Sequence, residues 1–267
     1  MKKILKQGFP FWALLLFSSC ICEDRSNCPS WLNLDFSAMS QQIESVHLIF
    51  QSEKGIFFQD TLLPQEWQRP YEIPLNKGRI SLAVFCNIQN MQLCNDAYLI
   101  PIGEQADPIH TDFQWLDLTH ETETLHILPK KNHITLFINL IGYHPEKEVL
   151  EIRIQGTAQG YDLKGNVVLG SFSSIAQPTP LALVVSDRLP ELSCRIPRQK
   201  DNKLELIVCV RDSITHRFPL GQVMMDAGLN MQQETLDDWH FTLDLSKLSL
   251  TLDIEDWIEL NPYEVNF

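Results

Sequence analysis

The sequence predicts an all-β protein with two tandem antiparallel β-sandwich domains. Three observations lead to this fold class. Apolar and polar residues alternate with a period of two through much of the chain, which is typical of strands that bury one face. Helical periodicity is scarce. The apolar runs are short, and Asn, Asp, Gly and Pro separate them, as turn residues do in sandwich folds.

The strand pattern recurs from residue 46 to residue 252. Between residues 150 and 154, for example, Leu150, Ile152 and Ile154 alternate with Glu151 and Arg153. The expected strands cover residues 46–50, 80–88, 134–140, 150–154, 204–210, 241–245 and 248–252. Residues 40–46 and 64–68 have room for only one or two helical turns each.

A polar segment at residues 142–148 interrupts two strong strands and is the expected domain boundary. It contains Gly142 and Pro145, both of which favour turns. The first sandwich would then cover residues 31–142 and the second residues 143–267. Each half has a usual size for a sandwich domain.

The first residues follow the order of a secretory signal. Three lysines lie within the first six residues, a short apolar run ends at Phe17, and two serines precede Cys20. The run is shorter than the roughly 20 apolar residues that a transmembrane helix needs. A cysteine after small residues is what lipoprotein signal peptidase requires, because the thiol takes a diacylglycerol before the chain is cut.

Cys20 is therefore the predicted lipidation site and the first residue of the mature protein. Residues 1–19 would be the lipoprotein signal peptide and residues 20–30 a lipidated tether. An ordinary cleaved signal is the alternative, although no A-x-A-like site ends the apolar run. Phe17 stands at a position where lipoproteins more often have leucine.

The charge of the chain excludes some partners. Formal net charge is −13 over 267 residues. Without the three signal lysines, the mature chain has 18 basic against 34 acidic residues. Nucleic acid and anionic headgroups would repel such a chain. Membrane attachment would therefore depend on the lipid at Cys20.

Six cysteines remain if Cys20 is acylated, and six allow fifteen pairings. A hairpin with Asp201 and Asn202 at its tip would place Cys194 opposite Cys209, which predicts one disulfide. Cys86 and Cys94 flank a short polar loop and form a second candidate pair, which leaves Cys22 and Cys28. Buried free thiols are the alternative for several of these cysteines.

The sequence offers no clear catalytic or metal-binding constellation. His120 and His126 would share one face of a strand but lie roughly 20 Å apart, too far for one ion. Asp237, Asp238 and His240 offer an acid and a base without a nucleophile nearby. No nucleophile-elbow, zincin, P-loop or Rossmann glycine motif is present. We expect a non-catalytic protein without a cofactor or metal, although a spatially assembled hydrolase site stays open.

Exposed aromatic residues would favour a different function. Trp67, Trp115 and Trp239 could stack on sugars if they lie at the surface, whereas most sandwich tryptophans pack in the core. A surface lipoprotein that binds glycan or another small ligand is therefore the alternative to a structural role.

Both ends of the mature chain resemble one known family. The opening Cys-Ile-Cys-Glu-Asp-Arg-Ser-Asn-Cys-Pro at residues 20–29 resembles that of FimB-type fimbrial anchor lipoproteins, which serve type V pili of Gram-negative bacteria. The ending, residues 252–257 and 261–267, resembles the family's closing strand. The resemblance implies two transthyretin-like domains, within the broader transthyretin-like or immunoglobulin-like class of sandwiches.

The resemblance also implies a function. Proteins of this family lie at the outer membrane, fix a fimbrial shaft to the cell and limit its length. Their partners are shaft subunits, which join by strand complementation, in which an extended segment completes a neighbour's open sheet. The segment from Leu252 to Phe267 is the best candidate for a partner-facing strand, with a plain core strand as the alternative. Cys20 carries over as the lipidation site.

Overall fold

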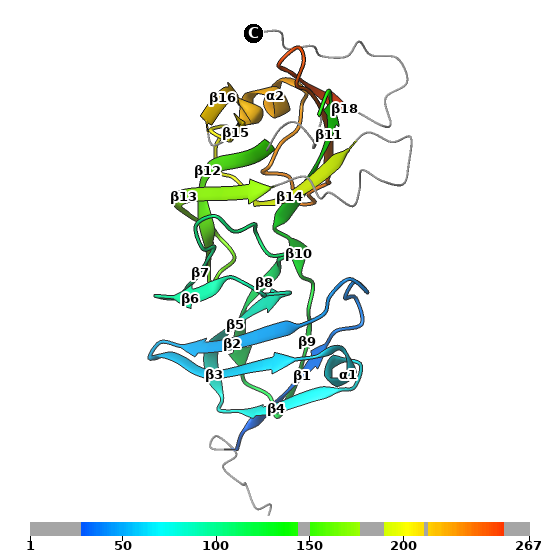
Figure 1. Ribbon diagram of the computed structural model, residues 1–267. Coiled ribbons are helices and arrows are strands. Elements are labelled where there is room, and N and C mark those ends of the chain that lie inside the picture. Colours follow the sequence, from blue (N-terminus) through cyan, green and yellow to red (C-terminus); the bar gives the residue numbers. More distant parts are fainter. Residues whose placement is uncertain (1–27, 144–149, 177–189, 211–212, 254–267) are drawn as a thin grey trace, which may run out of the picture.

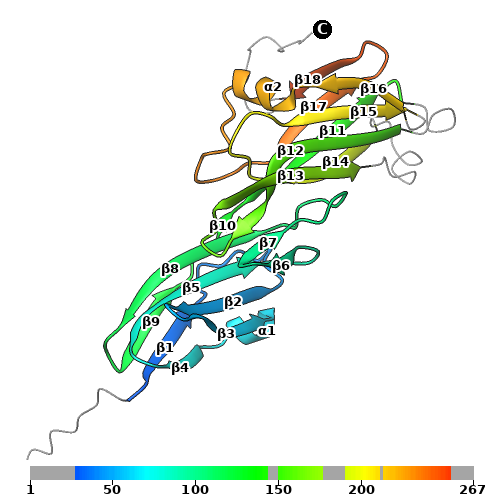
Figure 2. The same cartoon turned by 90° about the vertical axis from the view of Figure 1, so that its left-hand side faces the viewer.

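The computed structural model describes residues 28–143, 150–176, 190–210 and 213–253. Two β-sandwich halves follow one another along an elongated molecule (Figure 1). Nearly every element is a strand, so the predicted all-β class is confirmed. The first described strand lies at one end of the molecule and the last at the other, as Figure 2 also shows.

The N-terminal sandwich packs a three-stranded sheet on a five-stranded one. The three-stranded sheet has the order β4 (Tyr71–Leu75), β1 (Ser30–Asp35), β9 (Thr122–His126). The five-stranded sheet has the order β10 (Lys130–Lys131), β8 (His110–Leu118), β5 (Gly78–Cys86), β2 (Val46–Ser52), β3 (Gly55–Leu62). A short helix, α1 (Pro64–Trp67), joins β3 to β4. Alternate residues such as Leu48, Leu82 and Val84 meet Leu32 and Leu34 in the core, as period-two patterning requires.

The C-terminal sandwich packs a four-stranded sheet on a six-stranded one. The four-stranded sheet has the order β14 (Glu191–Pro197), β11 (His133–Ile141), β17 (Trp239–Asp244), β18 (Ser249–Asp253). The six-stranded sheet has the path β16 (Ser213–Phe218), β15 (Glu205–Val210), β12 (Leu150–Asp162), β7 (Ala97–Leu99), β6 (Gln92–Cys94), and β13 (Val167–Ala176) also pairs with β12. One short helix, α2 (Leu220–Asp226), follows β16.

The sheets divide the chain at a different place from the one that the sequence predicts. Strand β11 precedes the expected boundary at residues 142–143, yet it pairs with β14 and β17 of the C-terminal sandwich. The sheets therefore separate before His133, directly after β10. The polar segment that suggested the boundary connects β11 to β12 within the second half, and most of it lies outside the described residues.

A segment from the first half completes the sheet of the second. Strand β7 pairs with β12, with Tyr98 opposite Tyr161 and Leu99 opposite Gly160. A Cβ at Gly160 would lie 2.0 Å from the carbonyl oxygen of Tyr98, so this approach requires glycine. The Tyr98 ring also packs on Phe85 of β5, with centroids 4.7 Å apart. Phe85 and Tyr98 thereby join one hydrophobic core with residues of the C-terminal sandwich.

A buried carboxylate organises this crossing segment. Asp107 is fully buried, and its oxygens accept backbone N–H groups from Gln89, Asn90 and Met91 at 2.8–3.1 Å. A buried acid is stable only when hydrogen bonds replace its lost hydration. Asp107 therefore fixes both ends of the excursion that carries β6 and β7.

A second polar cluster holds the two halves together. The buried Tyr161 hydroxyl donates to the carbonyl of Asn132 and accepts the Arg198 N–H at 2.9 Å. The Arg198 guanidinium donates to Asn132 Oδ1 at 2.9 Å, to the carbonyl of Lys131 at 3.1 Å and to that of Met231 at 2.8 Å. These hydrogen bonds therefore connect the β10–β11 connection directly to the second sandwich.

Replacing Asp107 should loosen the joint. Asp107→Ala leaves three backbone donors without their acceptor in a buried site, which should lower the free energy of unfolding by about 3 kcal/mol or more. Asp162→Ala is the matched control, because Asp162 accepts the N–H groups of Lys164 and Asn166 at 2.9 Å in an exposed turn. Urea unfolding of both variants measures the difference; equal losses would contradict this role of Asp107.

The joint should also be sensitive to acid. His133 is buried beside His110, and burial lowers its pKa from 6.5 to about 4. The folded protein thus favours neutral His133, so this contribution is complete above pH 6.5 and is lost as pH falls toward 4. The loss should approach about 3 kcal/mol.

Chemical unfolding at a series of pH values measures this loss. His133→Gln keeps an amide donor for the Ile109 carbonyl, which His133 Nδ1 contacts at 3.1 Å, and should flatten the profile between pH 6.5 and 4. The exposed His120→Gln should leave the profile unchanged. An unaltered slope in His133→Gln would refute the assignment.

Candidate functional site

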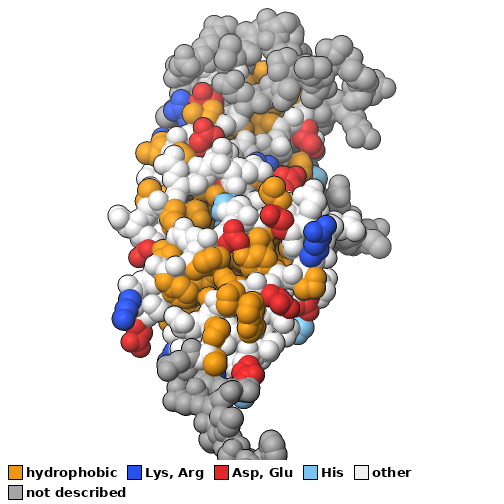
Figure 3. All heavy atoms as spheres, turned by 90° about the horizontal axis from the view of Figure 1, so that it is seen from below, with side chains coloured by type: hydrophobic (Ala, Val, Ile, Leu, Met, Phe, Trp, Pro, Cys, Tyr) orange, Lys and Arg blue, Asp and Glu red, His pale blue; other side chains and the backbone are white. Residues whose placement is uncertain are grey.

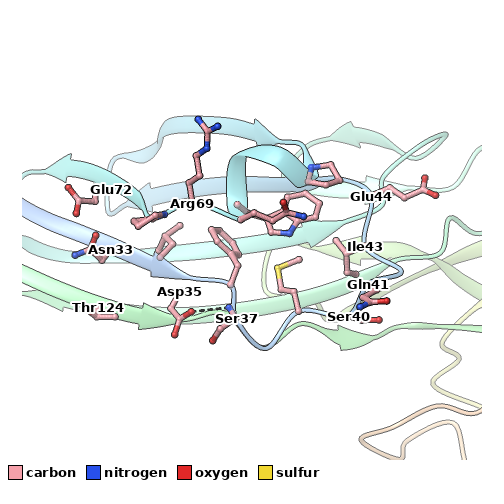
Figure 4. A pocket seen from close by; sticks show the side chains of 17 residues that line it. Asn33, Asp35, Ser37, Ser40, Gln41, Ile43, Glu44, Arg69, Glu72 and Thr124 are labelled. Atoms are coloured by element: carbon pink, nitrogen blue, oxygen red, sulfur yellow. Dashed lines mark hydrogen bonds between the residues drawn. The ribbon is translucent and has the colours of Figure 1, made fainter.

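A large groove with a volume of about 1010 Å³ lies on the N-terminal sandwich. Residues 36–44, which follow β1, form one side, and residues 64–70, around α1, form the other. The ends of β1, β4 and β9 also contribute to it (Figure 4). We call it the outer groove. Its apolar lining comprises Leu34, Phe36, Met39, Ile43, Pro64, Trp67 and Pro70.

Local hydrogen bonds shape both sides of the outer groove. Asp35 Oδ1 accepts the Ser37 N–H at 2.9 Å and turns the chain at the end of β1. The Glu66 carboxylate accepts the Leu63 N–H at 2.7 Å, which starts α1 with Pro64 in its first turn. These are local caps, and they fix where each side of the groove begins.

One residue ties the groove to the joint between the halves. Buried Asn87 accepts the Glu44 N–H at 2.7 Å and donates to the carbonyls of Gln42 and Pro108 at 3.2 and 3.3 Å. It adopts a φ of 61°, which asparagine tolerates better than most residues. Asn87 thus holds the 36–44 side against the same segment that Asp107 organises.

The outer groove carries more acids than bases. Asp35, Glu44 and Glu72 line it together with Arg69, which is the one basic residue among its described lining. The Ser37 N–H and the adjacent His126 lower the pKa of Asp35, so this carboxylate stays ionised at neutral pH. The groove therefore repels anions.

Three amides in the lining lack protein partners. Among the described residues, the side chains of Asn33, Gln41 and Gln68 make no hydrogen bond to the protein. Each amide offers donors and an acceptor, so these groups are free to bind a polar ligand.

The three tryptophans named in the sequence analysis have different surroundings. Trp239 is buried in β17. Trp115 is 56% exposed on β8, where the Arg79 guanidinium lies 5.0 Å from its ring and Phe113 packs edge-on. Trp67 is half-buried and lines the outer groove. Figure 3 shows hydrophobic side chains gathered on the end of the molecule formed by the N-terminal half.

The predicted ionisable residues serve structural roles. His126 contacts Asp35 at 2.7 Å, whereas His120 lies outside β9. Asp238 accepts the Lys131 ammonium and the Thr135 N–H, both at 2.7 Å, and His240 stacks on Phe137. No cluster of three or more potential metal ligands occurs in the part of the chain that the structure describes.

The predicted disulfide pairs are not formed. Cys194 lies in β14, which pairs with β11, whereas Cys209 lies in β15, which pairs with β12 and β16. The expected hairpin is therefore wrong: the two strands belong to opposite sheets. Cys86 is buried in β5 and Cys94 is exposed in β6, and both are free thiols. Cys28 is also free, and Cys22 lies outside the described residues.

The predicted partner strand is described only at its start. Residues 249–253 form β18 at the edge of the four-stranded sheet, paired with β17 on one side. Leu250 and Leu252 are buried against the core. The other edge of β18 has no partner among the described strands. Residues 254–267 lie outside the described residues, as does the lipidation site Cys20.

Sequence comparison finds no matching protein-family model and no matching curated protein. The fold, however, matches solved structures along nearly their whole length. An adhesin candidate from Bacteroides ovatus has a TM-score of 0.62 at 11% identity, covering 90% of this chain and 95% of that one. The fimbrial anchor protein Mfa2 from Porphyromonas gingivalis has a TM-score of 0.62 at 12% identity, covering 86% and 98%.

A polysaccharide-binding candidate from Bacteroides thetaiotaomicron is similar at a TM-score of 0.59 and 11% identity, covering 85% of this chain and 96% of that one. The shared feature at these identities is the fold. The predicted resemblance to fimbrial anchor proteins is thus confirmed at the level of the fold. Among the described residues, no helix is long and apolar enough to cross a membrane.

Thiol reactivity should follow burial. Burial raises the pKa of Cys86 to about 12 and that of Cys194 to about 11, and thiolate is the reactive form. At pH 8, iodoacetamide should therefore modify exposed Cys94 at least ~100-fold faster than either buried thiol. Peptide mapping by mass spectrometry measures the rates, with urea-unfolded protein as the control. A recovered Cys194–Cys209 disulfide peptide would overturn the free-thiol assignment.

Proposed function

We propose that this protein is a non-catalytic outer-membrane lipoprotein that anchors a fimbrial shaft to the cell surface and limits its length. The observation that carries the proposal is the shared two-sandwich fold, which covers 86% of this chain and 98% of the fimbrial anchor Mfa2. The tether motif at residues 20–29 supports the same assignment independently, since it was recognised from the sequence alone.

The positions of the first and last described strands suit an anchor. Strand β1 follows the tether at one end of the molecule, and β18 lies at the other (Figure 2). A pulling force on the shaft would therefore act along the long axis of this protein. Strand β1 lies between β4 and β9 and pairs with both along most of its length. Force on the tether would therefore act parallel to β1 and strain the backbone hydrogen bonds to both neighbouring strands at once.

The partner-facing strand in this proposal is the segment from Leu252 to Phe267. It continues from β18, whose outer edge has no partner among the described strands. An extended segment next to such an edge can satisfy backbone N–H and C=O groups of a neighbouring subunit. Shaft subunits would join at this end, away from the membrane.

The lipid on Cys20 should be essential for attachment. Cys20→Ala should yield a folded protein that is released from the outer membrane and no longer labelled by palmitate, because the electrostatics of this acidic chain would not replace the acyl chains. Cys28→Ala is the matched control and should stay labelled and bound. Membrane fractionation with radioactive palmitate measures both. A Cys20→Ala protein that is still labelled and bound would disprove the lipidation site.

Removal of the last residues should separate attachment to the membrane from attachment to the shaft. A variant lacking residues 261–267 should remain in the outer membrane, whereas shaft subunits should appear in the culture medium. Immunoblots of cell-bound and shed shaft protein measure this, with thermal unfolding as a check on the fold. Fimbriae that stay attached at wild-type length would refute the role of this segment.

A further inference from the structure

The outer groove has the composition of a ligand site rather than of a plain surface depression. Its volume of about 1010 Å³ is at the upper end of the range for small-molecule sites. Trp67 packs against the N-terminal core and also lines the groove. Met39 and Pro70 add apolar surface beside it. A ligand with both apolar faces and polar edges would fit this lining.

The polar groups of the groove point to a ligand rich in hydroxyls. The amides of Asn33, Gln41 and Gln68 have no hydrogen-bond partner in the described chain, and Arg69 and Glu72 add a donor group and an acceptor. Hydroxyl groups can both donate and accept, so they match a mixed set of amides and charged groups. A pyranose ring also has an apolar face, which an indole can cover.

Strand addition does not suit the outer groove. An added strand needs a row of unpaired backbone groups. Strand β1, which supplies Asn33, Leu34 and Asp35 to the groove, is paired on one side with β4 and on the other with β9. The edge strands β4 and β9 contribute only Glu72 and Thr124 to the lining. Recognition in the groove therefore depends on side chains, and the partner strand proposed above would lie at β18 instead.

The charge of the groove restricts the class of sugar that can bind. Asp35, Glu44 and Glu72 outnumber Arg69 in the lining, so a sialylated, sulfated or uronic-acid sugar would meet repulsion. We propose that the outer groove binds a neutral oligosaccharide, with Trp67 stacking on one pyranose ring and the amides of Asn33, Gln41 and Gln68 bonding its hydroxyls. This binding goes beyond anchoring and does not depend on it.

An array of neutral and sialylated oligosaccharides tests the proposal with the full mature chain carrying Cys20→Ser, which stays in aqueous solution. The strongest neutral oligosaccharide on the array is then titrated by calorimetry. Trp67→Ala should weaken its binding at least tenfold. Gln68→Ala changes an exposed side chain and should weaken binding about fivefold, without altering thermal stability. Trp115→Ala is the matched control, an exposed tryptophan outside the groove, and should bind as wild type.

Each result decides the proposal. It is overturned if no neutral oligosaccharide on the array binds, if a sialylated one binds more tightly, or if Trp115→Ala loses binding while Gln68→Ala keeps it. Because Trp67 packs on the core, Gln68→Ala decides the case if Trp67→Ala unfolds. Membrane attachment and shaft retention are measured separately, so a failure here leaves the anchoring proposal standing, and the reverse also holds.

Discussion

The joint between the two sandwiches is the constraint on which the rest of the structure depends. Strand β7 leaves the N-terminal sandwich and pairs with β12 of the C-terminal one, at a point where only Gly160 lets the backbones approach. The buried Asp107 carboxylate accepts hydrogen bonds from backbone N–H groups of this crossing segment, which water would otherwise satisfy. One hydrophobic core then runs from β5 into the second half. The proposed anchoring role would need such a joint, because a flexible linker would transmit load without fixing the direction of one half relative to the other.

The same joint also holds one side of the outer groove in place. Asn87, at the start of the crossing segment, holds residues 42–44 through its side-chain amide. The side of the groove that contains Met39 therefore depends on a residue about fifty positions away. This arrangement places a side-chain recognition site on the N-terminal half and a free strand edge on the C-terminal half. The two proposed interactions would then use opposite halves of one molecule.

Local patterns correctly predicted the seven expected strands but not others, such as β8 and β13, and they predicted pairing between strands less well. Alternation of Leu150, Ile152 and Ile154 with polar neighbours correctly predicted the start of β12. The expected hairpin between residues 194 and 209 was wrong, because β14 and β15 enter opposite sheets and prefer β11 and β12 as partners. Period two tells which face of a strand is buried, but it does not tell which strand lies beside it.

The sequence by itself determined the all-β class, the helical turn at residues 64–68 and the acidic charge, because each depends on neighbouring residues or on composition, whereas α2 was not expected. The lipidation of Cys20 stays a prediction from the sequence. Only the tertiary structure decided the rest. It placed β11 in the second half, brought β7 to β12, and assembled the outer groove from residues 33–44 and 64–72. It also distinguished buried Trp239 from exposed Trp115. These features depend on contacts between distant parts of the chain, whose loop-closure entropy and packing no local pattern encodes.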